Sequence, residues 1–166
     1  MEVLAAEHDR TSFVCGTPAL DRYFREQATQ DVRRRATACF VAVDIKTLCV
    51  AGYYTLAASS VPLPDIPAAL AKKLPRYPSV PVARLGRLAV ASAFQGRRLG
   101  GALLWDAASR ALLSEVAVFA LVVDAKDETA EAFYRHHGFI ALGTAGRQLV
   151  LPLESLSREM KTAERR

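Results

Sequence analysis

The stretch Arg87–Leu104 reads RLAVASAFQGRRLGGALL and is the most informative part of this chain. Its first residues are apolar and favour a strand, its middle combines glycine with two arginines, and its end has the apolar spacing of a helix. N–H groups in the first turn of a helix have no partner, and the helix dipole adds positive potential, so a diphosphate would bind there. The alternative is an ordinary strand–helix turn, in which glycine is common.

The glycine spacing of this turn narrows its chemistry. The pattern is neither GxGxxG nor GxxxxGK[ST], so the sequence does not support a dinucleotide-binding fold or a nucleotide hydrolase. The glycines allow close backbone approach to a ligand. A strongly positive φ at Arg98 would bring strain, because Arg98 carries a side chain where the glycine pattern has none.

Hydrophobic patterns on both sides of the stretch predict further strands and helices. We expect a helix at 18–34, a hairpin of strands at 38–43 and 48–58, and an irregular connection at 61–81 with a short helix at 68–74. Then follow a strand at 82–90, a helix at 99–114, a buried strand at 116–123, a helix at 127–137 ended by Gly138, and strands at 139–142 and 148–153. This order predicts a single α+β domain (an α/β sandwich) over residues 1–166, built on one mixed sheet.

Basic charge is concentrated in two segments of the 166-residue chain. Lys plus Arg number 22 against 17 for Asp plus Glu, and 17 of the 22 are arginine, whose flat guanidinium suits phosphates. Residues 76–110 hold six arginines and one aspartate, and a second basic cluster lies at 22–35. This concentration of positive charge predicts an anionic partner. For Arg33–Arg35, solvated arginines on a helix face are an equally good explanation.

Other features exclude several classes of protein. A content of 51% hydrophobic and 23% charged residues is typical of a globular domain. There is no run of about 18 apolar residues to span a membrane, and the N-terminus lacks the apolar core of a signal peptide. Cys15, Cys39 and Cys49 have no CxxC spacing, which argues against a disulfide scaffold or a metal site and predicts a cytoplasmic protein.

Two motifs, in this order, resemble the GNAT N-acetyltransferases. That family's acetyl-CoA loop has the form Gln/Arg-x-x-Gly-x-Gly/Ala, and residues 95–100, QGRRLG, match it except that Arg98 replaces the first glycine. Downstream, VVDA at 122–125 and AEAFYRHHGF at 130–139 are similar to the second half of the family's site. The resemblance implies the GNAT fold, with helices on both faces of the sheet and a splay between its two central strands. It implies binding of acetyl-CoA by Leu88, Ala89, Val90, Gln95, Gly96, Arg97, Arg98, Leu99, Gly100, Gly101, Asp124, Ala130 and Phe133.

Tyr134 matches the tyrosine that commonly protonates the departing CoA thiolate in this family. A phenol of pKa about 10 can supply a proton as charge develops on a thiol of pKa about 8.5. The alternative is a core tyrosine with a satisfied hydroxyl. No general base stands out, because Glu131 suits a solvated helix position and His136 and His137 suit a helix end. The lack of a general base favours an α-amine over a lysine as acceptor, because an α-amine, with a pKa of about 7.7–8.0, is already partly neutral at pH 7.

Three further segments, Phe13–Tyr23, Gly52–Ala57 and Pro81–Val90, resemble the TacT and AtaT type of GNAT toxin from toxin–antitoxin pairs. This resemblance implies acetylation of the α-amine of aminoacyl-tRNA and a block of translation. It also implies a homodimer, a ribbon-helix-helix antitoxin and, through the antitoxin, binding to operator DNA. Since cations that neutralise phosphates release counterions, the candidates for tRNA binding are Arg22, Arg25, Arg33, Arg34, Arg35, Arg76, Arg84 and Arg87.

Two other functions stay open at this point. The chain could be a GNAT acetyltransferase for a small-molecule or protein amine, or a catalytically weak CoA-binding module whose main role is to bind antitoxin and DNA. The diphosphate of CoA would account for part of the basic charge at 76–110, so the toxin prediction depends more on the motifs than on the charge.

Overall fold

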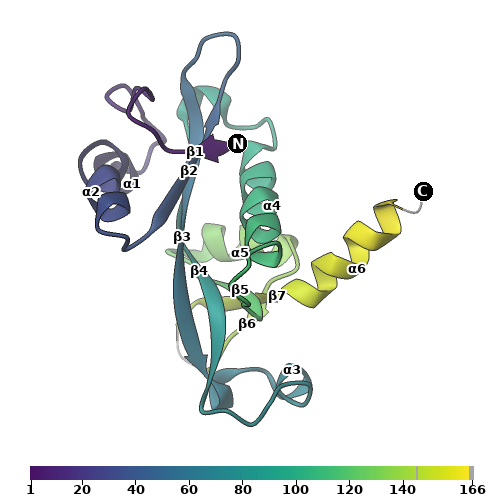
Figure 1. The fold of residues 1–166 in the computed structure, drawn as a ribbon. Helices are drawn as coiled ribbons and strands as arrows, with labels where there is room; N and C mark the ends of the chain where they lie inside the picture. Colours follow the sequence, from purple (N-terminus) through teal and green to yellow (C-terminus); the bar gives the residue numbers. More distant parts are fainter. Residues whose placement is uncertain (145, 165–166) are drawn as a thin grey trace. The chain divides into compact units, whose positions relative to one another are not determined.

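The computed structural model describes residues 1–144 and 146–164, with side chains as far as Arg158. Its helices are α1 (Pro18–Arg22), α2 (Ala28–Arg33), α3 (Ala68–Ala71), α4 (Leu99–Leu112), α5 (Glu128–His136) and α6 (Leu153–Glu164). Its strands are β1 (Glu2–Val3), β2 (Ala38–Val43), β3 (Val50–Pro62), β4 (Ser79–Val90), β5 (Ala120–Asp124), β6 (Ile140–Ala141) and β7 (Gln148–Pro152). Figure 1 shows these elements coloured along the chain.

The strands form one mixed sheet, as predicted. Their order is β1-β2-β3-β4-β5-β7-β6. The pairs β1–β2, β2–β3, β5–β7 and β6–β7 are antiparallel, whereas β4 and β5 are parallel. Contacts divide the chain into two compact units, of which the first comprises Met1–Ala57 and Leu85–Ala107 and the second Ala58–Arg84 and Ala108–Arg166. Strands β3 and β4 contribute to both.

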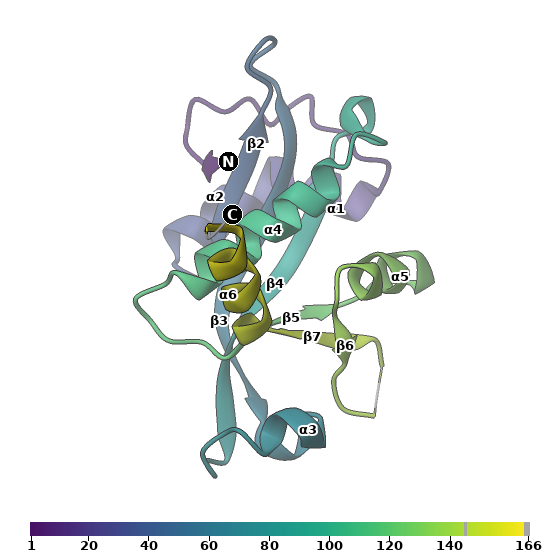
Figure 2. The same ribbon diagram turned by 90° about the vertical axis from the view of Figure 1, so that its right-hand side faces the viewer.

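In the first unit, helices cover both faces of β2 and β3, with α1 and α2 on one face and α4 on the other (Figures 1 and 2). On the α1–α2 face, the ring of Phe24 stacks on Tyr53 at 4.3 Å, and Phe13 packs edge-on against Phe24 at 4.9 Å. On the α4 face, Tyr54 stacks on Phe40 at 5.1 Å. Period-two alternation along the strands therefore supplies two separate apolar layers.

The helix predicted at 18–34 forms, but a π-helical turn at Tyr23–Gln27 separates α1 from α2. A guanidinium nitrogen of Arg10 donates hydrogen bonds to the carbonyl oxygens of Phe24, at 2.8 Å, and Arg25, at 3.1 Å. These bonds give the turn donors from outside the helix, which supports its irregular geometry.

The second unit surrounds β5, β7 and β6, which lie near α5 in Figure 2. Its core contains Val80, Val82, Val122 and Val150, all at most 5% exposed. The polar cap of α5 is Asp127, whose carboxylate accepts from the N–H of Ala130 at 2.8 Å, and the helix ends before Gly138, as predicted.

Three features differ from the prediction. The strand expected at 116–123 begins only at Ala120, because the chain before it turns through Ser114, whose hydroxyl accepts from the N–H of Val116. Strand β1 and helix α6 were not predicted; β1 has only two residues, and α6 is fastened by buried Leu153 and Leu156.

No helix within the described residues combines the length and apolar character needed to cross a membrane.

Candidate active site

Residues 91–98, which we call the phosphate loop, connect β4 to α4 in the first unit. The first bond into the helix runs from the N–H of Ala102 to the carbonyl of Arg98, at 3.3 Å. The N–H groups of Gly96, Arg97 and Arg98 make no hydrogen bond within the described part of the chain. Together with the unpaired amides that begin every helix, they form a row of donors for an anion. This row extends over Gly96, Arg97, Arg98, Leu99, Gly100 and Gly101.

Arg98 adopts a φ of +61°, in the left-handed region where its side chain was expected to cause strain. Neighbouring Gly96 also has a positive φ, of +76°. The loop therefore keeps the conformation that glycine favours and accepts strain of about 1–2 kcal/mol at the arginine. The Arg98 side chain is exposed and adds a charge at the start of α4.

Gln95 holds the loop from within; its predicted contact with the cofactor stays a prediction. Its side-chain amide donates to the carbonyl oxygens of Cys15, at 2.8 Å, and Val90, at 2.9 Å. The N–H of Ser92 donates to the carbonyl of Val14 at 2.8 Å. Gln95 is thus a positioning residue that fastens the loop to the end of β4 and to residues 13–16.

Asp21 supports the same attachment and was not among the predicted site residues. Its carboxylate is 4% exposed and accepts from the N–H of Cys15 at 2.8 Å. The Cys15 peptide is therefore held on one side by Asp21 and on the other by Gln95. The sequence does not single out Asp21, since Glu26 and Asp31 are acidic residues of the same expected helix.

Gly52 lets the sheet and α4 approach closely under the phosphate loop. A Cβ at this position would lie 2.8 Å from Cδ1 of Leu103 and 2.9 Å from the carbonyl oxygen of Ala89. Both distances are shorter than van der Waals contact, so only glycine fits. Ala89, with Leu88 and Val90 beside it, forms the last part of β4 before the loop.

Tyr134 lies on α5 in the second unit, with its ring between those of Phe133, at 5.2 Å, and Phe139, at 5.4 Å. Burial raises the pKa of its phenol to about 12. Its hydroxyl makes no hydrogen bond to any described residue, whereas the hydroxyls of Tyr23, Tyr53 and Tyr54 each have an internal acceptor. Tyr134 is therefore a protonated, unengaged donor rather than a satisfied core tyrosine.

Glu131, one turn before Tyr134, forms ion pairs with two arginines. Arg135 reaches its carboxylate at 2.9 Å and Arg147 at 3.3 Å. Arg147 also lies 3.6 Å from Glu128, so the residue before β7 is tied to α5 at two points. Glu131 therefore helps to hold α5, the helix that carries Tyr134. Because its carboxylate is already paired with two cations, it is a poor general base.

The remaining cofactor candidates in the second unit have different surroundings. The carboxylate of Asp124 pairs with Arg84 at 2.5 Å, so both side chains are engaged with each other. Ala130 is held in the first turn of α5, and the ring of Phe133 packs against His137 at 4.6 Å.

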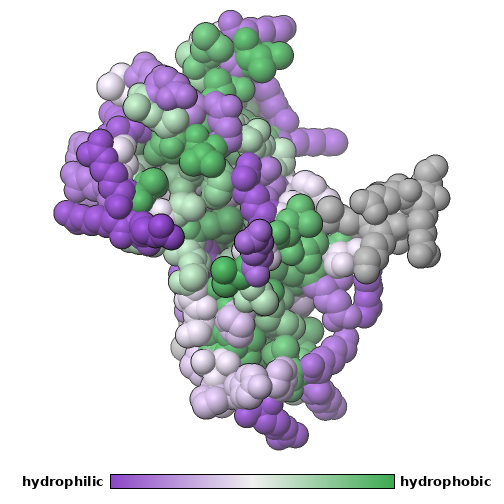
Figure 3. All heavy atoms as spheres, viewed as in Figure 1, coloured by the Kyte–Doolittle hydropathy of each residue, from purple (hydrophilic) through white to green (hydrophobic). Residues whose placement is uncertain are grey.

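The arginines proposed for tRNA binding divide into engaged and exposed side chains. In the first unit, Arg87 lies 3.5 Å above the ring of Tyr23, and Arg25 donates to the carbonyl of Asp21 at 3.3 Å. The hydrophilic surface over α1 and α2 in Figure 3 contains the exposed side chains of Arg22, Arg25, Arg33, Arg34 and Arg35. In the second unit, Arg76 is exposed and Arg84 is paired.

Comparison with known proteins identifies the family. Residues 3–139 match the acetyltransferase (GNAT) family. A tRNA-acetylating toxin of Mycobacterium tuberculosis is 38% identical over 133 residues, which cover 79% of this chain and 78% of the relative.

Solved structures of the same kind superpose closely. AtaT complexed with acetyl-methionyl-tRNAfMet is 28% identical, with a TM-score of 0.88 and coverage of 96% of this chain and 97% of that one. A tyrosine-to-phenylalanine variant of AtaT, bound to the C-terminus of the antitoxin AtaR and acetyl-CoA, is 25% identical with a TM-score of 0.81, and 96% of each chain is covered. The AtaT–AtaR complex bound to DNA is 26% identical with a TM-score of 0.77, covering 96% of this chain and 97% of that one. The match over residues 3–139 shows that this chain belongs to the GNAT acetyltransferase family.

Proposed function

We propose that this protein transfers the acetyl group of acetyl-CoA to the α-amine of an aminoacyl-tRNA and thereby blocks translation as the toxin of a toxin–antitoxin pair. The observation that carries the proposal is the 38% identity, over 79% of the chain, to a tRNA-acetylating toxin. The relative AtaT, which has been solved with an acetylated methionyl-tRNA, supports the same substrate class.

The phosphate loop fits the diphosphate of acetyl-CoA. Its unpaired amides offer hydrogen-bond donors in a row, and the exposed Arg97 and Arg98 add positive charge. When bound, acetyl-CoA supplies an activated acetyl group as a thioester. The chain's own contribution is to hold the loop rigid through Gln95 and, at Leu88–Val90, to offer the end of β4 to the thioester carbonyl.

The reaction needs one proton donor and a neutral amine. The amine nitrogen attacks the thioester carbonyl carbon, the carbon–sulfur bond breaks, and Tyr134 gives its phenolic proton to the CoA thiolate. Water takes the proton that the amine loses. Because the pKa of Tyr134 is raised to about 12, the donor stays protonated at neutral pH. The α-amine needs no strong base, since its pKa is about 7.7–8.0.

The exposed arginines of α1 and α2 are the surface we assign to the tRNA backbone. They give this part of the first unit a cluster of exposed positive charges. Arg87, stacked on Tyr23, presents a guanidinium of fixed orientation and can contact a phosphate from that position. Arg84 is the weaker candidate because Asp124 already neutralises it.

The same proposal includes the partners and the cellular location. An antitoxin of the ribbon-helix-helix type would neutralise the toxin and bring it to operator DNA; the relative AtaT has been solved together with AtaR and DNA. The active form would be a homodimer in the cytoplasm, where aminoacyl-tRNA is found.

The deciding experiment is acetyl transfer from labelled acetyl-CoA to purified aminoacyl-tRNAs, with small amines and a lysine peptide in parallel. We expect label on aminoacyl-tRNA, and a loss of at least about 100-fold in kcat for Tyr134→Phe. Tyr54→Phe is the matched control, because it removes the same atom from a tyrosine whose hydroxyl is bonded to Asp106. Label on the small amines alone would make the chain a metabolic or protein acetyltransferase, and CoA binding without transfer would make it a binding module.

A further inference from the structure

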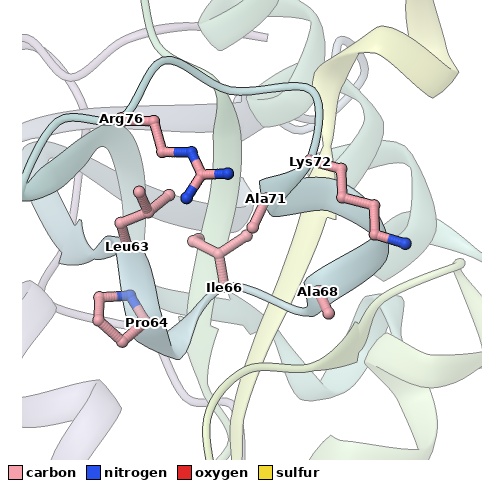
Figure 4. Close-up of a pocket in the computed structure, with 7 residues that line it drawn as sticks. All are labelled: Leu63, Pro64, Ile66, Ala68, Ala71, Lys72 and Arg76. Atoms are coloured by element: carbon pink, nitrogen blue, oxygen red, sulfur yellow. The ribbon is translucent and has the colours of Figure 1, made fainter.

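A hollow of about 400 Å³ opens beside α3 in the second unit (Figure 4). Its apolar lining is aliphatic and comes from Leu63, Pro64, Ile66, Ala68 and Ala71. A volume of this size is within the range of small-molecule sites, about 300–1,000 Å³. None of the family motifs in the sequence falls on it, and the chemical steps proposed above do not use it.

The charged side chains that line the hollow are both cations. Figure 4 shows the guanidinium of Arg76 pointing toward Ile66 and Ala71, while Lys72 extends along the outer side of α3. Neither makes an ion pair with a described residue, in contrast to Lys73, which lies 3.8 Å from Glu154. The lining includes no carboxylate, so the hollow attracts an anionic ligand with an apolar body.

The lining combines cations with an apolar floor, which is the pairing of contacts that an unpaired nucleotide uses. Tyr77, the next residue after Arg76 in the sequence, is 67% exposed. Unpaired bases stack on aromatic rings and on guanidinium planes, and their phosphates pair with lysine and arginine. A base-paired stem is too wide for the hollow, whereas a single base is not.

We infer that the hollow is a binding subsite for one unpaired nucleotide of the RNA substrate. The base lies on the aliphatic lining, and its phosphate contacts Arg76 and Lys72. This inference rests on the proposed function, because it names a contact that the tRNA makes with the second unit. An acidic peptide carries similar charge and is the competing ligand in the test.

The test uses the full chain with labelled methyl groups of Ile, Leu and Ala, titrated with a single-stranded RNA that ends in CCA. We expect signals of Leu63, Ile66 and Ala71 to shift. Arg76→Glu and Lys72→Glu should each weaken binding about tenfold and reduce the slope of log K against log salt by about 0.7. Lys46→Glu, which removes an exposed charge in the β2–β3 turn, should not change the affinity.

Three results would overturn the inference: RNA binding that leaves those methyl signals unmoved, equal shifts from inorganic phosphate alone, or shifts from an acidic peptide but not from RNA. The conservative Arg76→Gln keeps the test valid if a charge reversal disturbs folding.

Failure of the two proposals can be told apart. If no aminoacyl-tRNA is acetylated but RNA still fills the hollow, only the proposed function fails; if tRNA is acetylated and Arg76→Glu leaves its KM unchanged, only the subsite fails.

Discussion

Replacing Gln95 by alanine should loosen the phosphate loop by a calculable amount. The side-chain amide donates two hydrogen bonds, of 2.8 and 2.9 Å, to carbonyls of Cys15 and Val90. A neutral hydrogen bond contributes about 0.5–1.5 kcal/mol to the free energy of unfolding. Because the Gln95 side chain is exposed, its two hydrogen bonds together should contribute about 1–2 kcal/mol. For a chain of this length that corresponds to a fall in Tm of roughly 2–8 °C.

Binding of acetyl-CoA should weaken by a related factor. A loop that is no longer held before binding must be ordered during binding, and this cost appears in the affinity. If the full 1–2 kcal/mol appears there, the dissociation constant of acetyl-CoA rises by roughly 5- to 30-fold. The KM for tRNA should change little.

Gln95→Glu sharpens the test because it keeps the shape of the side chain. A carboxylate would face two carbonyl oxygens, so acceptor would meet acceptor, and the loss at pH 7 should exceed that of alanine. At low pH the protonated carboxyl can donate one bond, and the deficit should shrink. Urea unfolding and calorimetric titration with acetyl-CoA measure both effects, with Gln30→Ala on exposed α2 as the control. A glutamate variant as stable and as tight-binding as the wild type at pH 7 would refute this account of the loop.

Four other outcomes follow from the geometry. Leu48 is 75% exposed at a φ of +59°, so Leu48→Gly should stabilise the protein by about 0.5–1 kcal/mol in urea unfolding, whereas Ile45→Gly in the same turn should destabilise it. Arg98→Gly should be about 1 kcal/mol more stable than Arg98→Ala, while both lose acetyl-CoA affinity in calorimetry; equal stability would mean that the φ of +61° carries no strain. Glu131→Gln should lower kcat less than tenfold without shifting the pH profile, because loss of a general base would cost about 10²–10⁴-fold. The transfer rate, measured on an amide-linked aminoacyl-tRNA, should rise to a plateau near pH 9 and stay flat to pH 10, because the acceptor amine is then neutral and the raised pKa of Tyr134, about 12, keeps the donor protonated; a rate still rising tenfold per unit at pH 10 would point to lysine.

Local patterns predicted those parts of the fold that local chemistry controls. The helix at 99–114, the hairpin around residues 44–47 and the stop at Gly138 were all visible in the sequence, and the structure confirms them within a few residues. The start of β5 was misplaced because Val116 and its neighbours are apolar yet exposed, at 71% for Val116. Hydrophobicity alone does not show which apolar run finds a partner strand.

The supports of the site could not be predicted, because they join residues that are far apart in the chain. Gln95 and the carbonyl of Cys15 are separated by 80 positions, and nothing in either segment indicates the other. The ion pair between Glu131 and Arg147 likewise joins two segments whose sequences do not indicate each other. The motifs therefore indicated the phosphate loop and α5, but they did not indicate the contacts that hold these two segments in place.

The partners of the arginines change what the net charge of +5 means. Arg10, Arg84, Arg87 and Arg147 are engaged inside the fold, with carbonyls, carboxylates or an aromatic ring. An arginine that is held in this way has lost part of its capacity to neutralise a phosphate, so a count of basic residues overstates the surface available to RNA. Among the arginines proposed for tRNA binding, the exposed ones lie at 22–35, on and beside α1 and α2, and at Arg76 beside α3. Charge reversal at these positions, rather than at Arg84 or Arg87, should raise the KM for tRNA while leaving acetyl-CoA binding intact.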